Sequence, residues 1–110
     1  MNTPSFTLDI NEGFYGSQND EAAFFEWLDK IECVAGYSGL HEDGSDFVRL
    51  ELTTDTPNES DLRDLIALHH RFGREMGRMA QFSTKQNENW FADPKMYWHE
   101  AIFKPQAAKV

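Results

Sequence analysis

The chain has 110 residues, of which 40% are hydrophobic and 14% aromatic, and its formal net charge is −9. This length and apolar content suit one packed domain over residues 1–110 and exclude a disordered chain. A sequence pI near 4.7 disfavours nucleic acid and anionic membranes as partners, because phosphate binding rests mainly on lysine and arginine.

The charge is unevenly distributed along the chain. Of the 19 acidic residues, 15 lie in the first 64 positions, where only Lys30, Arg49 and Arg63 oppose them. From Leu65 onward, 7 basic residues outnumber 4 acidic ones. Long-range charge steers association and does not choose a fold, so the acidic half predicts a basic partner.

The first expected element is a strand over residues 5–10. Its apolar residues alternate with polar ones in the two-residue period of a half-buried strand: Phe6, Leu8 and Ile10. A loop with two glycines follows over residues 11–19.

A helix is expected next, over residues 20–32, with Asn19 or Asp20 as its N-cap. The spacing i, i+3, i+4, i+7 defines its apolar stripe: Phe24, Trp27, Leu28 and Ile31. Acidic residues occupy the opposite face of this helix.

Residues 34–41 and 47–53 predict a β-hairpin. They flank an Asp43-Gly44 dipeptide, which supplies the positive φ angles that tight hairpin turns require. Alternation in the second arm places Val48, Leu50 and Leu52 toward the core.

A second amphipathic helix is expected to begin at Ser60 and to end at Gly73, which can adopt the left-handed conformation. One histidine is expected on its apolar face, which consists of Leu62, Leu65, Ile66, His69 and Phe72.

The chain is expected to continue helically over residues 74–82, with Met76, Met79 and Ala80 buried. A polar connector follows over residues 83–89. Pro94 is then expected in the first turn of a last helix, and the tail from residue 105 is expected to fray.

Four aromatic residues close to the end of the chain are expected in the core, because their spacing is helical: Trp90, Phe91, Tyr97 and Trp98. Strands first and helices last predict an α+β fold, with a small antiparallel sheet containing a hairpin packed against three to four helices.

Cys33 is the only cysteine, so no internal disulfide can form, and a buried unreactive thiol is favoured over a nucleophile. The chain starts without a signal-peptide pattern and holds no apolar run of about 20 residues. We therefore expect a cytoplasmic protein.

No phosphate-binding glycine loop, paired-cysteine motif, His-Glu-x-x-His or Gly-x-Ser-x-Gly is present. We therefore expect no enzymatic activity, no cofactor and no metal. His69 is expected in the core and His70 on a solvated basic strip with Arg63 and Arg74, because adjacent helical residues diverge by about 100°. His99 and Glu100 diverge in the same way.

Two segments concentrate carboxylates. The first turn holds Glu42, Asp43 and Asp46, and the second loop holds Asp55, Glu59 and Asp61. Like charges held this closely oppose folding, and a cationic protein partner would explain why they are kept together. That explanation and a merely solvated pair of turns are equally favoured. A calcium loop is disfavoured because the Asp-x-Asp-x-Asp-Gly pattern is absent. Tyr37 or Phe47 is the expected apolar anchor for a partner.

Four segments of the C-terminal half resemble those of small bacterial proteins associated with toxin immunity: residues 61–68, 81–82, 89–91 and 97–103. The resemblance implies an immunity protein of a contact-dependent inhibition or related polymorphic toxin system. Such proteins bind and neutralise a cognate toxin domain, often a nuclease, and carboxylates can imitate phosphate to a basic cleft.

Two other classes of function remain open from the sequence. One is an adaptor domain that binds a protein without inhibiting it. The other is a small hydrolase, in which His70, His99 and Glu100 would have to converge in a cleft.

Overall fold

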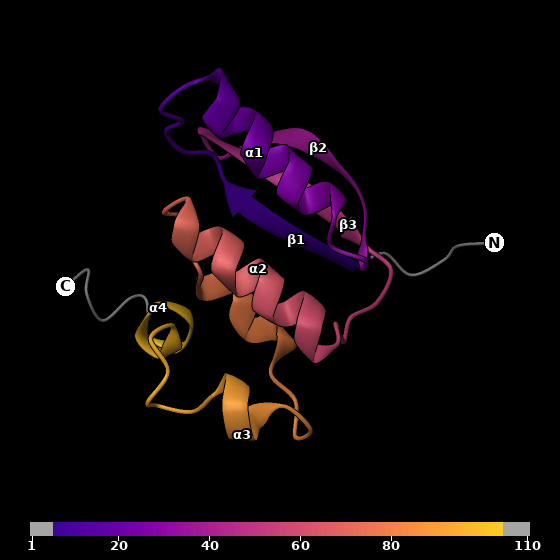
Figure 1. Ribbon diagram of the computed structural model, residues 1–110, viewed down its shortest axis with the longest axis vertical. Coiled ribbons are helices and arrows are strands. Elements are labelled where there is room, and N and C mark those ends of the chain that lie inside the picture. Colours follow the sequence, from indigo (N-terminus) through magenta and orange to yellow (C-terminus); the bar gives the residue numbers. More distant parts are fainter. Residues whose placement is uncertain (1–5, 105–110) are drawn as a thin grey trace.

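The computed structural model describes residues 6–104 (Figure 1). Three strands form one antiparallel sheet in the order β1-β3-β2: β1 (Phe6–Asn11), β2 (Val34–Glu42) and β3 (Ser45–Leu52). The other described elements are helical: α1 (Gln18–Asp29), α2 (Glu59–Arg71), the 3₁₀ helix η1 (Gly77–Phe82), α3 (Glu88–Phe91) and α4 (His99–Phe103). The predicted α+β fold is confirmed. Ser5 and the tail from residue 105 lie outside the described residues.

The layers are visible in Figure 1. Helix α1 crosses in front of the sheet, α2 lies on the β1 side of it, and α3 and α4 lie beyond α2. The 3₁₀ helix η1 contacts both α4 and β1. Strand β2 is therefore the edge of the sheet that lies farthest from the C-terminal helices.

Register explains which side chains of the sheet are buried. Leu8 pairs with Leu50, and Ile10 with Val48, across β1 and β3. All four side chains are buried, with at most 3% of their surface exposed, under Phe24 and Leu28 of α1. The predicted inward alternation of the second hairpin arm is thus confirmed.

The opposite face of the sheet carries a cross-strand ion pair. Arg49 donates from Nε and Nη2 to the two carboxylate oxygens of Asp9, at 2.8 and 2.9 Å. These hydrogen bonds lower the pKa of Asp9 below its ordinary value. The bidentate geometry fixes the β1–β3 register on the solvated face.

The hairpin turn between β2 and β3 is built as the Asp-Gly dipeptide predicts. Asp43 has a φ of 54° and Gly44 a φ of 77°. Positive φ at both central residues gives a two-residue turn whose twist matches that of the strands.

Helix α1 begins earlier than expected, because Ser17 and not Asn19 or Asp20 is its N-cap. Ser17 Oγ accepts from the amide of Asp20 at 3.1 Å. The Asp20 carboxylate in turn accepts from the amide of Gly16 at 2.9 Å. This reciprocal pair satisfies two amides that precede the helical hydrogen-bond ladder.

Helix α2 also begins before the predicted residue. Asn58 is its N-cap, with Oδ1 accepting from the amide of Asp61 at 2.8 Å, so the prediction of Ser60 is wrong by two residues. The predicted apolar stripe is correct, and Gly73, with a φ of 68°, ends the helix as expected.

The C-terminal third is less helical than predicted. Residues 74–76 are not helical, and residues 77–82 form the 3₁₀ helix η1, although Met76 and Met79 are buried as expected. Pro94 does not open a helix, because the amide of Met96 bonds the carbonyl of Asp93 at 3.0 Å and α4 starts only at His99.

Three of the four C-terminal aromatic residues pack inward. Phe91 and Trp98 are buried, and Trp98 Nε1 donates to the Phe91 carbonyl at 2.8 Å. Trp90 packs against this core, but Tyr97 is 60% exposed, so its predicted burial is wrong. Helical spacing failed there because Tyr97 lies in the turn before α4.

Candidate protein-binding surface at the hairpin end of the sheet

The carboxylates of the first acidic segment lie together at the turn between β2 and β3. Glu42, Asp43 and Asp46 are all exposed. His41 Nδ1 lies 2.6 Å from Asp46 Oδ1, whereas neither Glu42 nor Asp43 forms a salt bridge with any residue within 6–104. Two exposed carboxylates here therefore have no cation of their own.

Two further carboxylates join this turn from distant parts of the sequence. The amide of Glu12 donates to the Asp46 carbonyl at 2.9 Å, and the amide of Glu75 donates to Asn11 Oδ1 at 2.8 Å. We call this surface the hairpin end, defined by five exposed carboxylates: Glu12, Glu42, Asp43, Asp46 and Glu75.

A shallow groove of about 320 Å³ crosses the hairpin end. Its walls are mainly polar, and Phe47 is the one aromatic side chain in it. The residues that line the groove are Asn11, Glu12, Ser45, Asp46, Phe47 and Glu75. The Arg78 guanidinium stands 4.9 Å from the centroid of the Phe47 ring. Phe47, an expected anchor for a partner, is thus half-buried and already contacts a cation of this chain.

Within residues 6–104 the most exposed aromatic side chain is that of Phe14, which no sequence pattern above indicated as a binding residue. It is 86% exposed and lies in the loop between β1 and α1, two residues after Glu12. Its sequence signal was an aromatic residue among Asn, Gly and Ser, outside any apolar stripe. Exposed phenylalanine rings are favourable anchors because a partner pocket can desolvate them completely.

The Phe14 loop rests on Arg74, which was wrongly predicted on the solvated basic strip. Arg74 is 5% exposed, and its guanidinium lies 4.9 Å from the Tyr15 ring and 5.2 Å from the Phe24 ring. Its Nη1 donates to the Phe72 carbonyl at 2.8 Å, while Nε and Nη2 are buried without a partner among the described residues.

Gly13 allows the loop to lie this close to the arginine. A Cβ atom at position 13 would stand 2.0 Å from Arg74 Nη1. Tyr15 closes the other side, and burial raises the pKa of its hydroxyl. These contacts hold the backbone on both sides of Phe14 and leave its ring in solvent.

Tyr37, the other expected anchor, lies on β2 and is 37% exposed. Its hydroxyl donates to Asp29 Oδ1 at 3.0 Å, and this bond raises the pKa of Tyr37. Its ring packs on Phe25 at 5.2 Å between centroids. Tyr37 is therefore partly exposed, and its hydroxyl group is already hydrogen-bonded within the chain.

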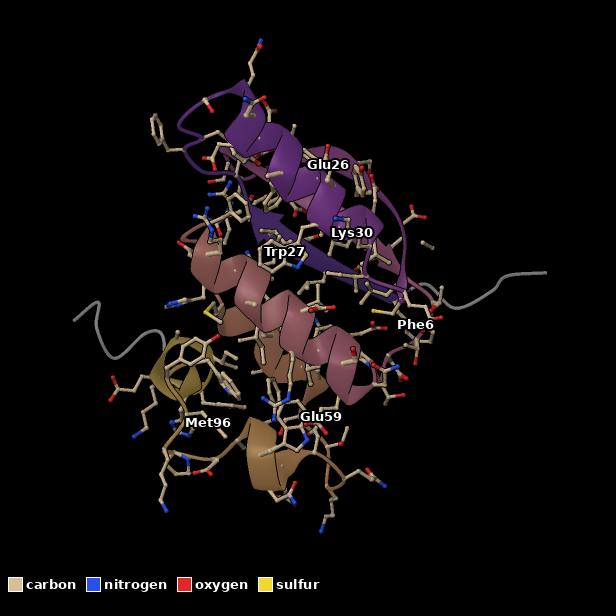
Figure 2. All side chains as sticks on the ribbon, in the orientation of Figure 1. Phe6, Glu26, Trp27, Lys30, Glu59 and Met96 are labelled. Atoms are coloured by element: carbon tan, nitrogen blue, oxygen red, sulfur yellow. The ribbon has the colours of Figure 1, made fainter. Side chains whose placement is uncertain are left out.

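The second acidic segment lies at the opposite end of the sheet, which we call the far end and define as residues 53–61. Phe6 pairs with Leu52 there, whereas Asn11 pairs with Phe47 at the hairpin end. Asp55 and Glu59 are exposed. Figure 2 shows Glu59 on the side of α2 that faces α3, where a groove of about 490 Å³ extends toward Trp90. The structure therefore does not unite the two acidic segments.

Asp61 requires a correction, because it is not an exposed partner-binding residue. It is 7% exposed, and its Oδ2 accepts from the backbone amide of Cys33 at 3.1 Å. Glu59 accepts from Arg63 Nε at 2.8 Å, one helical turn further on. The predicted burial of the Cys33 thiol is confirmed, and this burial raises its pKa to about 12.

The histidines have separate surroundings. His69 is 1% exposed and its Nδ1 donates to the Leu65 carbonyl at 2.7 Å, which confirms a core histidine. Burial lowers the pKa of His69 to about 4, so the ring is neutral at pH 7. The His70 ring meets Tyr97 edge-on, and the His99 ring lies against Phe103.

Another groove, of about 340 Å³, separates α1 and α2. Figure 2 shows Trp27 there between the two helices, with Glu26 and Lys30 also on α1.

Within residues 6–104 no three His, Cys, Asp or Glu side chains are placed to hold a metal ion together. No helix in that range is both long and apolar enough to cross a membrane.

No family model matches the chain, and no curated protein or solved structure matches it.

Proposed function

We propose that the protein is a non-enzymatic, cytoplasmic immunity protein that binds and neutralises a cognate basic, nuclease-like toxin domain through the hairpin end. One observation carries the proposal: Phe14, 86% exposed, lies on a loop bonded to the acidic turn. An exposed aromatic ring next to carboxylates without their own cations suits a partner with an apolar pocket and a basic rim.

Charge and apolar contact would have different effects in such a complex. The carboxylates accelerate encounter with lysine and arginine, and they can occupy the positions that nucleic-acid phosphates take in a basic cleft. Phe14 slows dissociation, because burying its ring removes apolar surface from water. Asp46 is part of the hairpin end, and Tyr37 lies on strand β2, which leads to the turn.

The test is to co-express the protein with any toxin domain that is encoded beside its gene, and to measure both cell survival and the affinity of the purified pair. Phe14→Ala should weaken affinity by about 2 kcal/mol, the scale of a hot-spot aromatic residue. Tyr97→Ala is the matched control, because Tyr97 is also exposed but lies near α4. Equal losses from the two variants would contradict the proposed surface.

Charge reversal tests the electrostatic part. Glu42→Lys combined with Asp46→Lys should slow association more at low salt than at high salt. Asp43 stays unchanged, because its φ of 54° suits aspartate and would strain lysine. Asp55→Lys combined with Glu88→Lys changes the charge equally at other exposed sites. If both double variants slow association equally, the attraction is non-specific and the hairpin end is not the binding surface.

The adaptor reading uses the same surface and predicts binding without rescue of the cells. A complex that forms and loses affinity with Phe14→Ala, while the toxin stays active in it, would support the adaptor over the inhibitor.

A further inference from the structure

Strand β2 is an open edge of the sheet. The order β1-β3-β2 leaves one side of β2 unpaired, whereas η1 contacts β1, the strand at the other edge. No side chain of Val34–Glu42 is buried. A Cβ atom built on Gly36 or Gly39 would meet nothing within 4 Å. The backbone of β2 is therefore accessible along most of its nine residues.

The hairpin geometry shows which amides of β2 point outward. Glu42 pairs with Ser45 beside the two-residue turn, where the flanking residues form a hydrogen-bonded pair, and hydrogen-bonded pairs then alternate. The Asp46 carbonyl bonds Glu12 on the β1 side, which agrees with this alternation. The backbone groups of Tyr37, Gly39 and His41 therefore point away from β3.

Natural sheets usually protect such an edge, and β2 lacks most of the protection. Lysine, proline, very short strands and bulges prevent a second chain from pairing. Strand β2 contains no lysine, arginine or proline, and its irregularity lies at Val34–Gly36, before the regular part. An accessible and regular edge of this kind is a site for β-strand addition.

Charge selects the occupant. The Tyr37 hydroxyl of β2 bonds Asp29 of α1, and β2 ends at Glu42, which Asp43 of the turn follows, so carboxylates flank the edge at its middle and at its turn. A second copy of this chain, at −9, would bring like charges together. An extended segment with lysine or arginine side chains would place cations beside these carboxylates.

We propose that β2 binds an extended, lysine- or arginine-bearing segment of a partner protein, which pairs with the outward backbone groups of Tyr37, Gly39 and His41 as a fourth strand. The identity of that partner rests on the proposed function, but the edge can be tested without the toxin.

The probe is a phage-displayed library of short random peptides selected on the purified, full-length protein. We expect enriched peptides with lysine or arginine at alternate positions. Amide shifts in a ¹⁵N spectrum should change at Tyr37, Gly39 and His41 when a synthetic copy is added. Acidic or uncharged winners, no enrichment, or shifts elsewhere would each overturn the proposal.

A pair of proline variants separates strand addition from general attraction. Gly39→Pro removes an outward amide without breaking a bond to β3, and Thr7→Pro does the same on β1, where the outward residues alternate likewise. Affinity for the peptide should fall about tenfold or more with Gly39→Pro, because the variant loses a backbone hydrogen bond to the peptide and the proline ring prevents close packing of the added strand. Thr7→Pro should leave it unchanged. If Gly39→Pro does not fold, His41→Pro takes its place.

Methylated peptides give the sharpest control, because methylating alternate backbone amides removes hydrogen bonds and keeps every charge. Of the two alternate methylation patterns, only one should abolish binding, since successive residues of a paired strand point their amides in opposite directions. Equal binding of both patterns would refute strand addition. A loss of cell protection with intact peptide binding would instead refute the inhibitor function.

Discussion

At the far end of the sheet a carboxylate belongs to the core, whereas at the hairpin end the carboxylates face solvent. Asp61 is buried and accepts from the Cys33 amide, and Glu59 pairs with Arg63. Glu42 and Asp43 are exposed and take part in no salt bridge within residues 6–104. Similar acidic density in the sequence is therefore partly buried and paired at one end of the sheet and exposed to solvent at the other.

The supports beneath the two ends differ as well. At the far end Asp61 accepts a hydrogen bond from the Cys33 amide, so removing its side chain would leave that buried amide without an acceptor. At the hairpin end the buried cation Arg74 lies under the Phe14 loop, stacked on Tyr15 and Phe24. The Phe14 loop is thus supported from beneath by contacts between a cation and aromatic rings, not by a buried carboxylate.

The largest expected effect is that of Asp61→Ala, which leaves the buried Cys33 amide without its acceptor. We expect the free energy of unfolding, measured in urea, to fall by about 2–3 kcal/mol. Asp46→Ala at the hairpin end should change it by no more than about 0.5 kcal/mol, as is usual for surface residues. If the two variants lose equal stability, the contrast between the ends is wrong.

Low pH should reduce the stability of the fold, because His69 is buried close to the positive charge of Arg74. The pKa of His69 is lowered from 6.5 to about 4, so the unfolded chain binds more protons between these values. The stability contributed by the neutral ring is present above pH 6.5 and is lost as the pH falls toward 4. Wild type should lose about 2 kcal/mol more than His69→Phe between pH 6.5 and 4.5, measured by urea unfolding. Parallel pH profiles would contradict this assignment.

Gly13→Ala tests the support of the Phe14 loop. The added methyl group would collide with Arg74 Nη1, so the loop or the arginine must shift, at a cost of about 1–3 kcal/mol in unfolding free energy. Gly16→Ala is the matched control, because the nearest atom to its Cβ is 3.8 Å away. Amide shifts in the variant should be confined to the loop and to residues 72–76. Shifts spread over the far end would show that the two ends are coupled.

Glu59→Gln should have the smallest effect. It breaks an exposed pair one helical turn apart, which contributes about 0.3–0.5 kcal/mol and is screened by salt. Thermal unfolding at low and high salt should show a difference from wild type only at low salt. A loss as large as that of Asp61→Ala would mean that the exposed acids of the far end also hold the fold.

Local patterns predicted much of the fold. The Asp43-Gly44 dipeptide and the alternation around Val48 and Leu50 were enough for the hairpin and its inward face, because turn type and side-chain period depend on neighbouring residues. The stripe of α2, including His69, followed from helical spacing. Helix ends were less certain: Ser17 and Asn58 are the caps, since several nearby residues could have accepted the same amides.

The candidate surface was only partly predictable. The exposed acids of the hairpin turn were named from sequence, but Phe14 was not, since its exposure depends on a loop held by a residue 60 positions away. Asp61 and Arg74 were expected in solvent, because charged residues usually are. Each is buried where a specific partner from another element meets it.

By itself, the sequence determined the α+β class, the strand pairing across the Asp-Gly turn, the inward stripe of α2 and the excess of negative charge, because these depend on composition and short-range periodicity. Only the tertiary structure decided which carboxylates remain free, that Phe14 projects beside them, and that β2 is an open edge. Those properties depend on contacts between segments far apart in the chain, which local spacing does not encode.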